Sequence, residues 1–111
     1  MRIYIAGKIT GLGYSEAVAK FAAAAAILKR LGHEPVNPME VNGLDGDGNE
    51  YAWAEYMKRD IPVLLGCDAI YLLPDWFDSK GARLEKYIAD ELGMLVIYES
   101  KPVDAVAALT Q

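Results

Sequence analysis

The segment DSKGARLE, residues 78–85, carries the residues best suited to chemistry. It follows an apolar run at 68–73 and leads into helical spacing at 82–92, so we expect a loop between a strand and a helix. Ser79 is a good helix N-cap, and Gly81 lets a ligand approach the backbone closely. Because a helix N-terminus presents free N–H groups and about half a positive charge, this loop suits an anion such as phosphate.

Glu85 lies about one helical turn further along, within reach of a group held at the helix start. A sugar carbon that loses its base passes through an oxocarbenium-like state, which a carboxylate can attack or stabilise. Lys80 and Arg83 place positive charge where the helix dipole opposes it, a weak indication of a bound anion. The simpler interpretations, a solvated glutamate and a serine cap without a ligand, stay open at this point.

Composition sets the class of protein. The chain has 111 residues, 53% of them hydrophobic, which suffices for one packed domain over residues 1–111. A net charge of -5 without an evident basic face argues against a nucleic-acid polymer as partner. Cys67 is the only cysteine, and no signal peptide or membrane span is evident, so a cytoplasmic protein is expected. His33 has no cysteine or histidine cluster near it, so we expect no metal and no cofactor.

Strand-like and helix-like segments alternate along the chain. We expect strands at 2–6, 33–37, 68–73 and 95–99, and helices at 15–31 with Ser15 as N-cap, 51–65 with a kink or boundary at Pro62, 80–92 and 103–109. Residues 39–50 are expected to be an irregular loop. The near-continuous apolar strands indicate a small α/β fold, a doubly wound (Rossmann-like or flavodoxin-like) parallel sheet of four or five strands with helices on both faces. The expected strand order is 2-1-3-4.

That order places a ligand site at the carboxyl ends of the first and third strands, where the strand order reverses. The loops there are GKITGLGY at 7–14 and PDWFDSKG at 74–81, with NPME at 37–40 nearby. The glycine spacing of the first loop matches neither the dinucleotide nor the Walker fingerprint. Topology and composition therefore predict the same site.

Five motifs occur along the chain: RIYIAG at 2–7, GHEPVNP at 32–38, YMKRDI at 56–61, CDAIYLLP at 67–74 and SKGARLE at 79–85. Together they resemble the nucleoside 2-deoxyribosyltransferase superfamily, and most closely its short, mostly uncharacterised phage and bacterial branch. The resemblance implies that Glu85 is the nucleophile and that Tyr4 orients it. It also implies that Asp60 contacts the substrate or assists proton transfer; without the resemblance, Asp60 beside Lys58 and Arg59 would be taken for a surface ion pair.

Two positions depart from the classical transferases. Ser79 stands where those enzymes carry a sugar-binding aspartate, whereas the related 2'-deoxynucleoside 5'-monophosphate N-hydrolases use a serine there to hold the 5'-phosphate. Lys8 stands where many relatives have proline or serine, and adds positive charge. The expected substrate-binding residues are therefore Gly7, Lys8, Ser79, Gly81 and Arg83.

The leading hypothesis is cleavage or transfer at the N-glycosidic bond of a (deoxy)nucleoside 5'-monophosphate. The alternatives are a non-catalytic protein that senses or sequesters a nucleotide and, more weakly, an assembly protein with a vestigial pocket. The resemblance implies a homo-oligomer, a dimer or larger, and Trp53, Trp76 and Phe77 in or near loops fit a subunit interface. Base preference is expected to depend on the surroundings of Ile9, Trp53 and Trp76.

Overall fold

Strands and helices alternate along the chain as predicted. The computed structural model describes residues 1–9, 11–41 and 53–99. The elements are β1 (Arg2–Ala6), α1 (Tyr14–Arg30), β2 (Glu34–Val36), α2 (Pro38–Val41), α3 (Trp53–Leu65), β3 (Ala69–Leu72), the 3-10 turn η1 (Trp76–Asp78), α4 (Lys80–Glu91) and β4 (Leu95–Tyr98). The helix expected at 103–109 and most of the loop expected at 39–50 lie outside the described residues. Within these ranges, no helix combines the length and apolarity that a membrane span requires.

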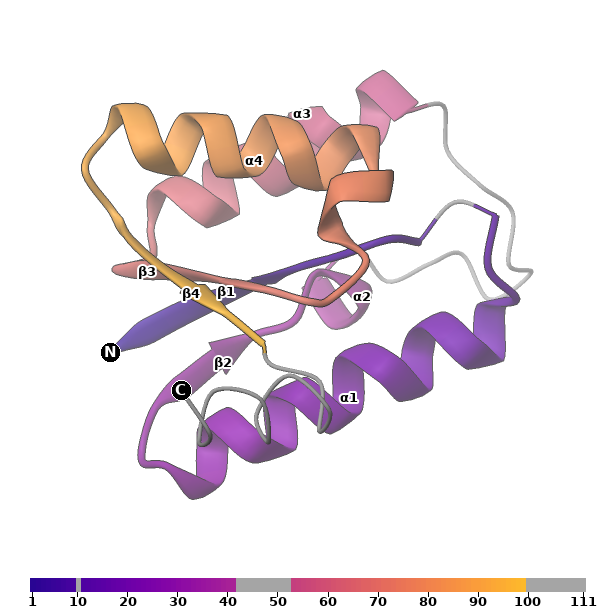
Figure 1. Ribbon diagram of the computed structural model, residues 1–111, viewed down its shortest axis with the longest axis horizontal. Coiled ribbons are helices and arrows are strands. Elements are labelled where there is room, and N and C mark those ends of the chain that lie inside the picture. The colour runs from indigo at the N-terminus through magenta and orange to yellow at the C-terminus, as the bar shows by residue number, and fades with distance from the viewer. Residues whose placement is uncertain (10, 42–52, 100–111) are drawn as a thin grey trace, which may run out of the picture.

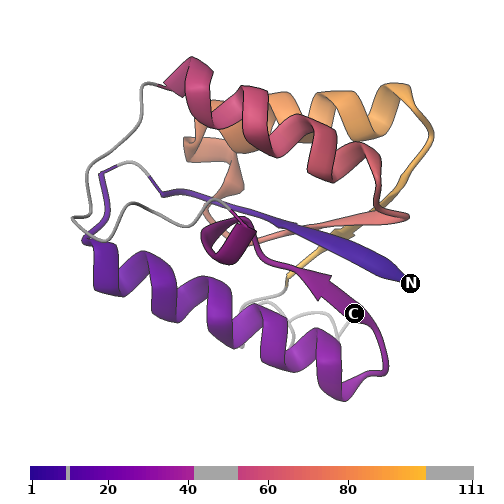
Figure 2. The ribbon, with the colours of Figure 1, turned by 180° about the vertical axis from the view of Figure 1, so that it is seen from behind.

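The sheet has four strands, all parallel, in the order β2-β1-β3-β4. This confirms the predicted fold class and strand order. Helices α3 and α4 cover one face of the sheet and α1 covers the other (Figure 1). The view from behind shows the same layers (Figure 2). The strand order therefore reverses between β1 and β3, and the loops that follow these two strands meet there.

Side chains of β1 alternate between the two faces of the sheet. Ile3 and Ile5 belong to the core cluster under α1, whereas Tyr4 and Ala6 belong to the cluster under α3 and α4. All four are almost fully buried. The alternation assigns Tyr4 to the same side of the sheet as α4, the helix that carries Glu85.

The predicted cap of α1 is wrong. The helix begins at Tyr14, its N-cap is Gly13 in extended conformation, and no side chain caps it. Ser15 lies in the first turn and is exposed. The first helical hydrogen bond, from the Ala17 N–H to the Gly13 carbonyl at 3.0 Å, forms two residues earlier than a cap at Ser15 would allow.

Two further expectations about helix boundaries are corrected. Residues Pro38–Val41 form the short helix α2, where the end of a strand and the start of an irregular loop were expected. The Asn37 side-chain oxygen accepts the Met39 N–H at 2.9 Å, and proline suits a first helical position because its missing N–H would have no partner there. Of the two alternatives for Pro62, a kink or a boundary, the boundary is wrong, because Pro62 lies inside α3.

Gly7 follows β1 directly and packs against Leu73, the residue after β3. A Cβ atom at Gly7 would lie 2.6 Å from Leu73 Cδ1 and 2.9 Å from Leu73 Cβ. We therefore expect Gly7→Ala to lower the free energy of unfolding by roughly 1–3 kcal/mol, measured by urea denaturation. Gly13→Ala is the control, because no heavy atom lies within 4 Å of its added Cβ. Equal stabilities of the two variants would contradict the close contact with Leu73.

Candidate functional site

A cavity of about 380 Å³ opens where the strand order reverses. This volume lies within the range of small-molecule sites, roughly 300–1,000 Å³. Its walls come from the loop after β1, from helix α3 and from the start of α4. The lining residues are Gly7, Lys8, Ile9, Trp53, Tyr56, Met57, Asp60, Asp78, Ser79, Lys80, Gly81, Ala82 and Glu85. The cavity therefore lies where strand order and loop composition predicted a site.

Glu85 and Tyr4 form a buried pair at this cavity. Glu85 is 5% exposed, Tyr4 is fully buried, and the Tyr4 hydroxyl donates a hydrogen bond to Glu85 Oε2. Burial raises the pKa of Glu85 from 4.5 to about 8; the Tyr4 hydrogen bond opposes this rise, and the nearby charge of Asp60 adds to it. Burial and then the charge of Glu85 hold the pKa of Tyr4 well above 10.0, so the phenol keeps its proton. A carboxyl group with a strongly raised pKa in a cavity is typical of a functional site.

Asp60 is a second carboxyl group in the cavity wall. It projects from α3 and is only 6% exposed, so the interpretation as a surface ion pair is wrong. Glycosidases use a pair of carboxyl groups that flank the scissile bond, and two carboxyl groups, Asp60 and Glu85, line this cavity. Across the part of the chain that the structure describes, no group of three or more His, Cys, Asp or Glu side chains is placed to hold a metal ion.

The start of α4 forms part of the cavity rim. Ser79 caps this helix as predicted, its Oγ accepting the Ala82 N–H at 3.1 Å. A Cβ atom at Gly81 would lie 3.2 Å from Met57 Sδ and 3.5 Å from Trp53 Nε1. The glycine therefore allows α3 and α4 to pack closely, and it also lines the cavity.

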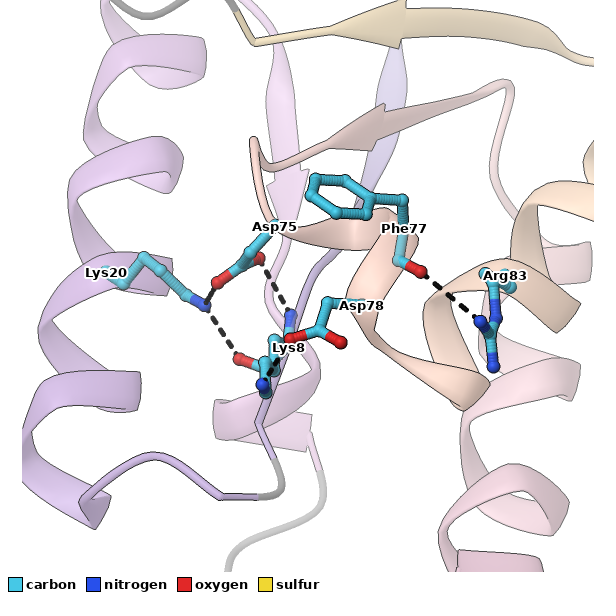
Figure 3. A network of polar contacts seen from close by, with 6 residues as sticks. All are labelled: Lys8, Lys20, Asp75, Phe77, Asp78 and Arg83. Carbon is cyan, nitrogen blue, oxygen red and sulfur yellow. Dashed lines mark hydrogen bonds and ion pairs between the residues drawn. The ribbon is translucent and has the colours of Figure 1, made fainter.

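The predicted cations take different positions. Lys8 lines the cavity, and its ammonium group lies 2.5 Å from the Asp78 carboxylate. Arg83 is exposed, donates a long hydrogen bond of 3.4 Å to the Phe77 carbonyl, and does not line the cavity. Figure 3 shows Arg83 beside Phe77 and away from Lys8. The structure thus brings together every predicted site residue except Arg83.

One family model matches this chain, over residues 1–98, and is described as a domain of unknown function (DUF4406). The chain belongs to the DUF4406 family. The match covers all four strands and the whole cavity of the DUF4406 domain. A search of curated proteins finds no match. The family description states no activity. The homo-oligomer and the cytoplasmic location stay predictions.

Sequence reasoning missed several cavity residues of the DUF4406 domain and misplaced one. Tyr56 and Met57 join Trp53 and Asp60 along one face of α3. Their spacing of three, four and seven residues is that of one helix face, a signal that was available in the sequence. Trp76, expected near the base, lies outside the cavity wall and packs against Tyr98 of β4 with ring centroids 6.0 Å apart.

Proposed function

We propose that this protein cleaves, or transfers across, the N-glycosidic bond of a (deoxy)nucleoside 5'-monophosphate, as a member of the nucleoside 2-deoxyribosyltransferase superfamily. The observation that carries the proposal is the buried Glu85 carboxyl group at the cavity. Tyr4 holds it by a hydrogen bond, and the charge of Asp60 helps to raise its pKa. Burying a carboxyl group costs stability unless something offsets it, so a glutamate facing a cavity at this depth calls for a functional reason.

The cavity supplies a separate region for each part of such a substrate. The cap residue Ser79, the start of α4 and Lys8 suit the 5'-phosphate, because free N–H groups and a cation attract an anion. Glu85 and Asp60 lie deeper and suit the sugar. Trp53 and Tyr56 offer aromatic surface on which a base can stack.

The reaction would proceed through two displacements at C1'. The ionised carboxylate of Glu85 bonds to C1' while the electron pair of the C1'–N bond passes to the base, which takes up a proton with the help of Asp60. Water then displaces the Glu85 oxygen from C1' and loses a proton, which gives hydrolysis; a second base in place of water gives transfer. Tyr4 orients the carboxylate throughout by its hydrogen bond.

One observation favours a second candidate, a non-catalytic nucleotide-binding protein. With a pKa of about 8, the Glu85 carboxyl group is largely protonated at neutral pH and can donate a hydrogen bond to a ligand. Both candidates require a bound nucleotide. Only the enzyme releases free base.

The direct test incubates the protein with each 2'-deoxynucleoside 5'-monophosphate and separates free base by chromatography. We expect release from at least one nucleotide and none from the Glu85→Ala variant. Retained nucleotide binding without release from any substrate would sink the enzymatic proposal and leave the binding protein. Release that survives in Glu85→Ala would exclude Glu85 as the nucleophile.

The pH dependence of base release tests the charge state of Glu85. Because the ionised form attacks, kcat/KM is expected to rise about tenfold per pH unit up to the pKa of about 8 and to level off above it. Measurements from about pH 7 upward keep the substrate phosphate, with its second pKa near 6, in one form. A rate that falls over this range would make protonated Glu85 the active species, as a proton donor.

Two variants should move that profile in opposite directions. Tyr4→Phe removes the hydrogen bond that lowers the pKa of Glu85, so the rise is expected at higher pH. Asp60→Asn removes a negative charge that raises the pKa, so the rise is expected at lower pH. Equal profiles in both variants would mean that the rise belongs to another group.

A further inference from the structure

Asp75 fixes the backbone of Lys8. One carboxylate oxygen accepts the Lys8 N–H at 3.0 Å, and the other lies 2.5 Å from the ammonium group of Lys20 on α1. The same ammonium group donates to the Lys8 carbonyl at 2.7 Å. Figure 3 shows these contacts between α1, the loop after β1 and the loop after β3. Both polar groups of the Lys8 backbone are therefore held, while its side chain is left to make other contacts.

The Lys8 side chain joins the two loops at the cavity. Its ammonium group lies 2.5 Å from the Asp78 carboxylate, and both residues line the cavity. The hydrogen bond to Asp78 and the charge of Asp78 raise the pKa of Lys8, and the same contact lowers the pKa of Asp78. The Asp78 side chain is 63% exposed, and an ion pair this open to water is weak and exchangeable.

We propose that the Lys8–Asp78 pair is a clasp that selects phosphorylated ligands, and that Asp75 and Lys20 are its positioning residues. The inference rests on the proposed function for the identity of the anion. An incoming 5'-phosphate, with up to two negative charges and three acceptor oxygens, takes Lys8 from Asp78. A nucleoside without phosphate cannot make this exchange and gains nothing from Lys8. Asp78 keeps Lys8 neutralised until a strong anion arrives.

The other lysines near the clasp are engaged differently. Lys20 is held between Asp75 and the Lys8 carbonyl, and its carboxylate partner is 32% exposed, half as much as Asp78. Lys80 lines the cavity, but its ammonium group lies 4.0 Å from the centroid of the Trp53 ring. Among the described lysines of the cavity wall, Lys8 is thus the one that pairs with a carboxylate, Asp78, which an incoming anion can replace.

The test is calorimetric titration of a 2'-deoxynucleoside 5'-monophosphate and of the matching nucleoside. All variants carry Glu85→Gln, so that no ligand is consumed. Asp78→Asn is expected to bind the monophosphate about 3- to 10-fold more tightly, because it frees Lys8 and removes a like charge. Lys8→Gln should bind it about 10-fold more weakly, and Lys20→Gln should follow in the same direction with a smaller loss. Nucleoside affinity should change less than about twofold in all three.

Asp90→Asn is the matched control. It removes the same charge from an exposed ion pair, with Lys86 at 2.6 Å, outside the cavity wall. If Asp90→Asn and Asp78→Asn gain the same affinity for the monophosphate, the gain comes from the lower net negative charge alone, and the clasp is wrong. Unchanged, weaker or undetectable monophosphate binding to Asp78→Asn would overturn it as well. If the variants change monophosphate affinity but not nucleoside affinity, and the protein with Glu85 intact releases no base, the clasp is retained and the enzymatic proposal is wrong. If the protein releases base but the variants do not change monophosphate affinity selectively, the enzymatic proposal is retained and the clasp is wrong.

Discussion

Replacing Glu85 by glutamine is expected to lower kcat/KM for base release by roughly a thousandfold or more. The amide has nearly the shape of the carboxyl group and can still accept the Tyr4 hydrogen bond. It cannot carry the negative charge that attacks C1' or stabilises an oxocarbenium-like carbon. The loss should therefore fall on the rate, measured from steady-state base release, while nucleotide affinity stays within about tenfold.

Glu91→Gln is the control for this loss, because Glu91 lies exposed on the same helix and outside the cavity wall. It should leave base release unchanged. A Glu85→Gln variant that turns over at more than about a tenth of the original rate would assign the reaction to another group.

The same substitution is expected to stabilise the folded protein at alkaline pH. The pKa of Glu85 is about 8 in the folded protein, against 4.5 for the free side chain, so the folded state holds a proton that the unfolded state releases. Stability from this group is fully present below about pH 4.5, falls as the pH rises toward 8, and is level above it. Glutamine is neutral at every pH, so the variant does not lose this stability as the pH rises. At about pH 9 we expect Glu85→Gln to raise the free energy of unfolding by roughly 2–4 kcal/mol.

Urea denaturation of both proteins at about pH 5 and about pH 9 measures the effect. Near pH 5 the protonated glutamate resembles glutamine, so the two stabilities should agree within about 1 kcal/mol. Glu91→Gln should show no such pH-dependent gain. A Glu85→Gln variant with the same stability difference at both pH values would contradict the raised pKa. A variant that is inactive and yet more stable would show that the buried carboxyl group is kept for function at the expense of stability.

The fold was predictable because each strand is short, apolar and followed by a helix-forming segment. The parallel order β2-β1-β3-β4 is one of the common doubly wound orders that this alternation and right-handed crossovers allow. Helix starts were less predictable. Ser15 is a better cap by residue type than Gly13, but α1 begins one residue before it, since the cap position depends on where the chain leaves the glycine-rich loop.

The candidate site was predictable where a single loop or helix start carries it. Ser79, Gly81 and Glu85 share one helix, and their roles in capping and lining follow from that spacing. Residue types alone did not reveal pairings between distant segments. Arg83 was expected to bind substrate because of its charge, but it donates to the Phe77 carbonyl. Asp78 and Lys20 contact Lys8, and only the folded chain brings these residues together.

The burial of Asp60 shows the same limit. Its neighbours Lys58 and Arg59 suggested a surface ion pair, and both are exposed. Asp60 falls on a different face of α3, in line with Trp53, Tyr56 and Met57, and this periodicity decides its position.

Identification of the sugar product in a single turnover tests the proposed reaction most directly. An excess of protein is mixed with the 2'-deoxynucleoside 5'-monophosphate that releases base fastest, and both products are quantified by chromatography and phosphorus magnetic resonance. Cleavage at C1' predicts equal amounts of free base and 2-deoxyribose 5-phosphate, with neither formed by Glu85→Gln. Release of inorganic phosphate with an intact nucleoside, or no product while the nucleotide stays bound, would contradict it.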